Sequence, residues 1–139
     1  MREYKFRGLD AVMGIWRYGS LDQHIWNENG WHAISLLRKD YREDGRYDKC
    51  WVKPETVGQY IGLTDENGKE IYEGDVLSIK LCNQEVFLEK YVIIFEDGCF
   101  LLYNETLGKS YHMATPFEMS VIGNVHDNPE LLEQKNERA

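Results

Sequence analysis

Apolar and polar residues alternate from the first residues of the chain. In the opening segment REYKFRGLD, Tyr4 and Phe6 fall on one face of an extended backbone, and Lys5 and Arg7 fall on the other. This period of two predicts a strand with one apolar and one charged face. The segment GIWRYGS, residues 14–20, has glycines near both of its ends, which favours a returning strand.

Residues 24–49 give a more mixed pattern. The segment HIWNENGWHAI, residues 24–34, places Asn-Glu-Asn-Gly between two aromatic-rich runs, which predicts a hairpin. Residues 31–40 fit a strand or a short helix, because their apolar positions form no clean stripe. Residues 39–49 are the most polar internal stretch, which predicts a long loop or a linker between two halves.

The strand signals become stronger after this polar stretch. Residues 56–63 (TVGQYIGL) form an extended run, and residues 65–68 (DENG) predict a turn that leads into a strand within residues 70–81. Residues 89–103 (EKYVIIFEDGCFLLY) are the clearest hairpin in the chain. Their Asp97-Gly98 pair suits a tight turn, because glycine accepts a positive φ without a Cβ clash.

The C-terminal segment adds one strand and one helix signal. Residues 120–122 predict a last short strand, and Asn128 and Pro129 suit the N-cap and the first position of a short helix. Short strands separated by turns favour a mainly β fold with minor α content over a βαβ layout. We expect an N-terminal β-rich region, a candidate for oligomerisation, over residues 1–49, a small β-barrel region over residues 50–127, and a short helix or tail over residues 128–139.

The charge of the chain is unevenly distributed. The net charge is −8 over 139 residues, but residues 1–60 hold 10 Lys and Arg against 9 Asp and Glu, a net of +1. Residues 61–139 hold 6 against 15, a net of −9. Because nucleic-acid affinity comes largely from Lys and Arg that displace counterions, this acidity disfavours nucleic-acid binding by the second half.

Other bulk features indicate a cytoplasmic protein. The N-terminus carries charges and no apolar stretch of the kind that a secretory signal requires, and no run of about 18 apolar residues suggests a membrane span. Cys50, Cys82 and Cys99 are odd in number and widely spaced, which favours reduced thiols over a disulfide framework.

The acidic segment DENGKEIYEGDVL, residues 65–77, does not fit the pattern of a calcium-binding loop. An EF-hand loop that began at Asp65 would need an oxygen ligand at Lys69, glycine at Glu70 and glutamate at Val76, so the motif fails at three positions. The histidines and cysteines lack the spacing of a zinc site, and no nucleophile elbow or phosphate-binding loop is present. We therefore expect no metal, no cofactor and no enzymatic activity.

Basic and aromatic residues are interleaved in the N-terminal half. Such residues on strands can pair with and stack on single-stranded nucleic acid, although aromatic residues also form cores and subunit interfaces. The balance of acids and bases in this half favours the core or interface interpretation. The residues of this candidate interaction surface are Arg2, Lys5, Arg7, Trp16, Trp26 and Trp31.

Three blocks of the sequence together form a recognisable pattern: MREYKFRGLD at the start, QYIGLTDENGKEIYEGDVLSIK at residues 59–80, and VIGNVHDNPELLE near the end. In this order they resemble the YopX family of bacteriophage and prophage proteins. The resemblance implies a β-rich fold with a small, strongly bent C-terminal barrel, a phage or prophage origin, oligomerisation and a place in the cytoplasm of a bacterial host. The resemblance does not say which activity the protein has, and it supplies no catalytic residues that could be carried over to this sequence.

The central block supplies the structural motif of the expected barrel: Gly62, Asp65, Asn67, Gly68, Ile71, Tyr72, Gly74 and Asp75. We expect Asn67-Gly68 to form the turn, Ile71 and Val76 to enter the core, and Tyr72 to pack at the rim. Gly74 would allow a bend or bulge, and Asp75 would accept hydrogen bonds from turn amides.

These observations lead to one functional hypothesis and one alternative. The hypothesis is a non-enzymatic, oligomeric protein-binding module whose partner is itself or a host protein. The alternative is single-stranded nucleic-acid binding through the N-terminal basic and aromatic strands.

Overall fold

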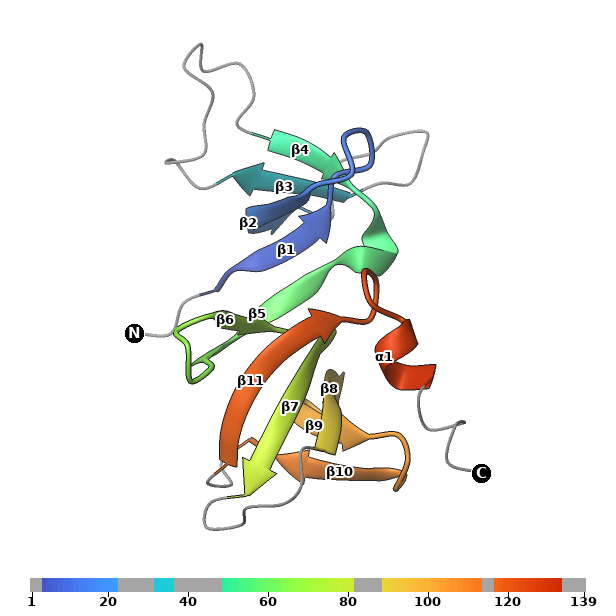
Figure 1. The fold of residues 1–139 in the computed structure, drawn as a ribbon. Helices are drawn as coiled ribbons and strands as arrows, with labels where there is room; N and C mark the ends of the chain where they lie inside the picture. The colour runs from blue at the N-terminus through green and yellow to red at the C-terminus, as the bar shows by residue number, and fades with distance from the viewer. Residues whose placement is uncertain (1–3, 23–31, 37–48, 82–88, 114–116, 134–139) are drawn as a thin grey trace. The chain divides into compact units, whose positions relative to one another are not determined.

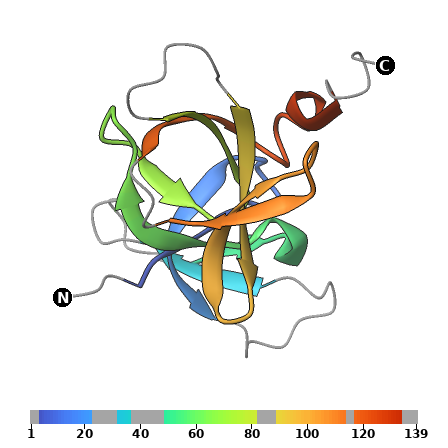
Figure 2. The ribbon, with the colours of Figure 1, turned by 90° about the horizontal axis from the view of Figure 1, so that it is seen from below.

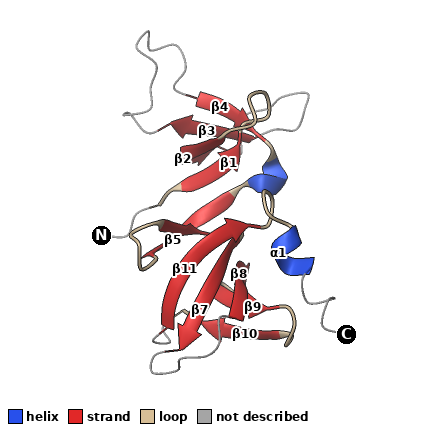
Figure 3. Ribbon diagram, viewed as in Figure 1, coloured by secondary structure: helices blue, strands red, loops and turns tan. Residues whose placement is uncertain are grey.

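The computed structural model describes residues 4–22, 32–36, 49–81, 89–113 and 117–133. Within these ranges the regular structure is almost entirely β, as predicted (Figures 1 and 3). The chain divides into two compact units, Met1–Tyr60 and Ile61–Ala139. The elements are β1 (Phe6–Leu9), β2 (Trp16–Asp22), β3 (His32–Leu36), β4 (Lys49–Val52), the 3₁₀ turn η2 (Pro54–Thr56), β5 (Gly58–Thr64), β6 (Glu70–Tyr72), β7 (Asp75–Leu81), β8 (Glu89–Glu96), β9 (Cys99–Asn104), β10 (Lys109–His112), β11 (Phe117–Asn124) and α1 (Glu130–Glu133).

The first unit is an antiparallel sheet in the order β4-β3-β2-β1, and the first residues of β5 pair with β1. Both strands expected at the start of the chain are confirmed. The segment that fitted a strand or a helix forms β3, which pairs with β2 on one side and β4 on the other. The hairpin turn expected at residues 27–30 and most of the polar stretch 39–49 lie outside the described residues.

The sheet of the first unit curls until the ends of β1 and β4 meet. Asp10 and Val52 form an isolated bridge, and the Lys53 N–H donates to the Leu9 carbonyl at 3.0 Å. Gly8 lies so close to β4 that an added Cβ would be 2.8 Å from the Cβ of Val52. Glycine at this position in β1 is therefore explained by the close approach of the two strands.

The second unit contains an antiparallel sheet in the order β10-β9-β8-β7-β11. The hairpin predicted at residues 89–103 is confirmed: β8 and β9 run side by side (Figures 1 and 2), with Phe95 opposite Phe100. Asp97 and Gly98 form the turn with φ values of 53° and 81°. The last strand, β11, is longer than residues 120–122, and its register with β7 shifts between Val121 and Gly123.

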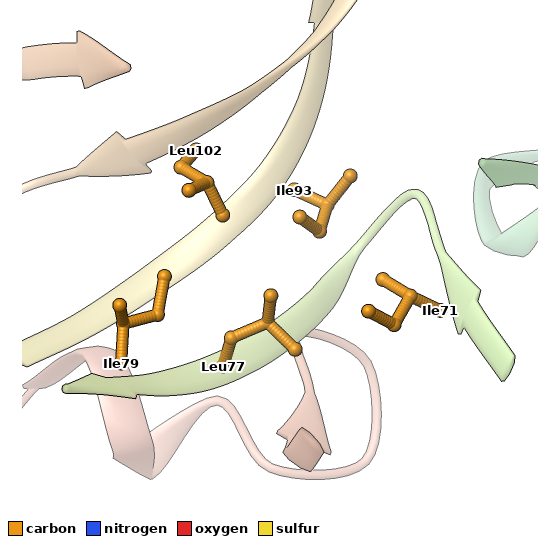
Figure 4. Packing of buried hydrophobic residues seen from close by; sticks show 5 residues of the cluster. All are labelled: Ile71, Leu77, Ile79, Ile93 and Leu102. Atoms are coloured by element: carbon orange, nitrogen blue, oxygen red, sulfur yellow. The ribbon is translucent and has the colours of Figure 1, made fainter. Parts of the chain in front are cut away.

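The core of the second unit follows from alternation along its strands. Leu77 and Ile79 of β7 point to the same face as Ile93 of β8 and Leu102 of β9, and all four are at most 3% exposed. Ile71 of β6 completes this cluster (Figure 4). Because successive strand residues point to opposite faces, these residues share one face of the sheet, and Val76 and Val92 are buried on the other.

Several features differ from the sequence-based expectations. Strands β4 and β10 and the η2 turn were not predicted, and the two units divide within β5 rather than at the polar stretch near residue 49. Pro129 was expected at the first position of the C-terminal helix, but α1 begins at Glu130. The Asn128 Oδ1 atom accepts a hydrogen bond from the Asn124 N–H. The described strands form two antiparallel sheets, so closure of the C-terminal strands into a barrel stays a prediction.

Candidate functional site

The central motif folds as a turn that lies along one edge of β11. The Oδ1 atom of Asp65 accepts hydrogen bonds from the N–H groups of Asn67 (2.8 Å) and Lys69 (2.9 Å), which fixes the turn between β5 and β6. The Oδ2 atom accepts a third hydrogen bond, from the N–H of Val121 in β11 (2.9 Å). One carboxylate therefore closes its own turn and joins it to a strand 56 residues away.

The same turn supplies a second backbone contact to β11. The Glu66 N–H donates to the Met119 carbonyl at 3.0 Å, while the other edge of β11 pairs with β7. In addition, the Ser120 hydroxyl donates to Glu66 Oε1 at 3.2 Å and accepts from Asn67 Nδ2 at 3.3 Å. An uncovered strand edge is a template for pairing with another chain, so this turn covers part of an otherwise open edge. We call residues 65–69 the edge turn.

The environment of Asp65 favours its ionised form. Burial acts to raise the pKa of this carboxyl group, but the backbone N–H groups of Val121, Lys69 and Asn67, together with the positive charge of Lys69, outweigh it. The pKa of Asp65 therefore lies below its ordinary value. Both oxygens of the carboxylate are engaged by the chain's own backbone, which gives Asp65 a structural role.

The second half of the motif forms another tight turn, between β6 and β7. Asp75 is 1% exposed, and its Oδ2 atom accepts a hydrogen bond from the Tyr72 N–H at 2.8 Å, as expected for a carboxylate that binds turn amides. Gly74 has φ of +91°, its N–H donates to Ile93 and its carbonyl accepts from Val125, both at 2.9 Å. The expectation that Tyr72 packs at the rim is wrong, because this residue is only 2% exposed.

The remaining motif residues have conformational or packing roles. Gly62 and Gly68 have φ of +92° and +81°, the left-handed region that glycine adopts at least cost. Ile71 and Val76 are fully buried, as expected. The structure thus brings the motif residues together as a folding unit of turns and core positions.

Buried polar residues elsewhere follow the same principle, which the sequence interpretation missed. Asp10, Asn104 and Asn124 stand at the ends of strands, and each accepts one or two hydrogen bonds from N–H groups two or three residues later at 2.8–2.9 Å. Thr56 accepts from the Leu9 N–H at 2.9 Å. The available signal was an Asp or Asn at or just after the end of an expected strand, which is typical of a side chain that closes a turn.

The candidate interaction surface is only partly described. Arg2, Trp26 and Trp31 lie outside the described residues. Lys5 and Arg7 are 8% and 5% exposed, so the expectation of a strand with an open charged face is wrong for these two residues. The Lys5 ammonium lies 5.0 Å from the ring centre of Tyr60, and the Arg7 guanidinium lies 4.8 Å from that of Trp16. These cations stack on aromatic rings of the same unit.

The turn between β1 and β2 presents apolar side chains to solvent. Val12, Met13 and Ile15 are 76%, 58% and 47% exposed. The turn is nevertheless well held. Asp10 accepts from the N–H groups of Val12 and Met13, its own N–H donates to the Ile15 carbonyl at 2.8 Å, and Arg17 Nε donates to its Oδ2 atom at 3.0 Å. We call Val12, Met13 and Ile15 the apolar tip.

Asp10, which holds the apolar tip, is also kept ionised. Burial acts to raise its pKa, but the hydrogen bonds from the backbone of Met13 and Val12 and the contact with Arg17 outweigh it, so the pKa lies below its ordinary value. The ionised carboxylate strengthens the hydrogen bonds that fix the turn.

Within the described ranges, no three His, Cys, Asp or Glu side chains are grouped so that they could hold a metal ion. No helix in this part of the chain is long and apolar enough to cross a membrane. Cys50 and Cys99 are half-buried, and Cys82 lies outside the described residues.

The described residues define a mainly β protein whose two units are built on antiparallel sheets and whose buried polar side chains fix the turns. The chain belongs to the YopX protein family, whose model matches residues 5–133. No curated protein matches the sequence.

Two solved structures have a similar fold. The protein EF1440 from Enterococcus faecalis is 22% identical, with a TM-score of 0.53 and coverage of 95% of this chain and 99% of that one. The protein yopX from Bacillus subtilis is 21% identical, with a TM-score of 0.54 and coverage of 95% and 97%. At these identities the likeness concerns the fold alone.

Proposed function

We propose that this chain is a non-enzymatic protein-binding module that self-associates, encoded by a phage or prophage and acting in the cytoplasm of a bacterial host. The origin and compartment rest on the family resemblance. The net negative charge of residues 61–139 disfavours nucleic-acid binding by the second half. A host protein is the further partner to be tested.

The observation that carries the proposal is the apolar tip. Burial of an exposed Val, Met or Ile side chain in a partner stabilises a complex by about 1.5–3 kcal/mol each. Because Asp10 already fixes the turn through its hydrogen bonds, little conformational entropy is lost on binding. A rigid turn with three exposed apolar side chains therefore suits insertion into an apolar surface of a partner.

The test compares two exposed apolar residues in different turns. Met13→Lys places a charge in the apolar tip, and Leu107→Lys does the same at a residue that is 54% exposed in the turn between β9 and β10. We expect light scattering after size-exclusion chromatography to show an oligomer for the wild type and for Leu107→Lys, and a shift towards monomer for Met13→Lys. A wild type that remains monomeric at all concentrations, or equal masses for all three proteins, would contradict self-association through the apolar tip.

The same pair of variants tests the host-protein version. A host protein that binds the tip should be captured from lysate by the wild type and by Leu107→Lys and lost with Met13→Lys. Single-stranded nucleic-acid binding is the competing function, and burial of Lys5 and Arg7 weighs against it. Binding of a labelled single strand that weakens steeply with salt would favour that alternative over our proposal.

A further inference from the structure

The edge turn contains a sequence with its own chemistry. In an Asn-Gly pair, the backbone nitrogen of glycine can attack the side-chain Cγ of asparagine, since no Cβ hinders the approach. A bond forms between Gly68 N and Asn67 Cγ, the Cγ–Nδ2 bond breaks, and the NH₂ group leaves as ammonia with the proton that Gly68 N gives up. Water then opens the cyclic imide at either carbonyl and yields aspartate or isoaspartate, without any oxidant, reductant or cofactor.

The structure places this pair where the reaction has access and space. Asn67 and Gly68 are both exposed, and no atom outside residues 67–69 lies within 4 Å of the position that a Gly68 Cβ would occupy. The amide of Asn67 is held by one 3.3 Å contact to the Ser120 hydroxyl, at the surface. The side chain is therefore accessible to water and held by a long, solvent-exposed hydrogen bond.

The other asparagines that the structure describes are in contrasting positions. Asn104 and Asn124 are 1% and 9% exposed, their Oδ1 atoms accept backbone hydrogen bonds, and a residue with a Cβ follows each. Asn128 precedes Pro129, which has no N–H to act as the nucleophile. The sequence contains a second Asn-Gly pair at residues 29–30, outside the described ranges.

We propose that Asn67 is a site of spontaneous conversion to isoaspartate in the folded protein, and that this conversion detaches the edge turn from β11. Isoaspartate adds one atom to the backbone between Asp65 and Lys69, whose N–H is bound by the Asp65 carboxylate. It also adds a negative charge next to Asp65 and Glu66 and removes the amide that contacts Ser120. The geometry that lets Asp65 reach both its own turn and Val121 is then lost.

The fold sets the rate of this reaction. The Gly68 N–H donates to the Asp65 carbonyl at 3.0 Å, and this hydrogen bond must open before the nitrogen can attack. We therefore expect conversion at Asn67 to be slower in the folded protein than in the urea-unfolded chain. Once the turn is detached, the outer edge of β11 becomes available for pairing with another strand.

The test follows the modification and its structural effect in the same sample. The full-length protein is incubated in warm, mildly alkaline buffer, and peptide mapping by mass spectrometry, with enzymatic methylation specific for isoaspartate, locates the product. We expect conversion at Asn67 and none at Asn104, Asn124 or Asn128. In the converted fraction, hydrogen exchange at the N–H of Val121 should become about 10- to 100-fold faster, as expected for the loss of one hydrogen bond to a charged acceptor.

The matched control is Asn67→Gln, which keeps an exposed amide at the surface but would have to close a six-membered ring. In this variant, the peptide that contains residue 67 should keep its mass, and Val121 should keep its slow exchange, over the same incubation. The proposal is overturned if Asn67 of the folded protein remains unmodified while it converts in the unfolded chain. Conversion at Asn67 that leaves the exchange of Val121 unchanged would equally overturn the link to β11.

Discussion

Replacement of Asp65 by asparagine tests whether a single carboxylate joins the edge turn to β11. The change preserves size and shape, but an amide offers one oxygen where the carboxylate offers two. In either orientation its NH₂ group faces a backbone N–H, either that of Val121 or those of Asn67 and Lys69. Loss of one hydrogen bond to a charged acceptor costs about 1.5–3 kcal/mol, and the opposed donors add to it. We expect Asp65→Asn to lower the free energy of unfolding of the second unit by about 3 kcal/mol.

The assay must report on the second unit. All four tryptophans lie within residues 1–60, so tryptophan fluorescence follows the first unit, whereas hydrogen exchange of β7 and β11 amides in increasing urea follows the second. Glu66→Gln is the matched control, because it removes the same charge one residue away at an exposed side chain and should change stability by less than about 0.5 kcal/mol. Equal effects of Asp65→Asn and Glu66→Gln would refute the reasoning.

The same variant should change the response to acid. The pKa of Asp65 is lower in the folded protein than its ordinary value of 3.8, so the folded state binds a proton less readily than the unfolded state. The resulting stability is present above the unfolded pKa and is lost as the pH falls through the folded pKa. Below about pH 4 the wild type should therefore lose stability relative to Asp65→Asn, and parallel pH profiles would contradict this.

Two further predictions concern close approach and turn geometry. Gly8→Ala should destabilise the first unit by about 1–3 kcal/mol, seen as an earlier tryptophan transition in urea, because the new Cβ would lie 2.8 Å from Val52; an unchanged midpoint would contradict the close approach. Gly74→Ala, at φ of +91°, and Asp75→Ala, at a buried carboxylate, should each lower the melting temperature clearly, whereas Glu66→Ala should be nearly silent. Equal, negligible shifts in all three would show that the motif is not a structural one.

The sequence indicated elements whose causes are local. Alternation and the Asp97-Gly98 pair were enough to predict the hairpin of β8 and β9, because side-chain period and turn conformation depend on neighbouring residues. The short strands β4 and β10 were missed because four residues carry too little periodicity to be recognised. These strands are instead fixed by pairing with β3 and β9, which lies outside the local sequence.

The tertiary structure decided what the polar residues do. From the sequence, Asp65 was one acid in an acidic turn, and Lys5 and Arg7 were the charged face of a strand. Only the fold brings the Val121 N–H to within 2.9 Å of Asp65 and places the two cations over Tyr60 and Trp16. Such contacts depend on how the strands are arranged in space, and their energy depends on burial and distance. The sequence by itself therefore determined the longer strands and the turns between them. Tertiary packing fixed the shortest strands and determined which polar groups hold the turns in place.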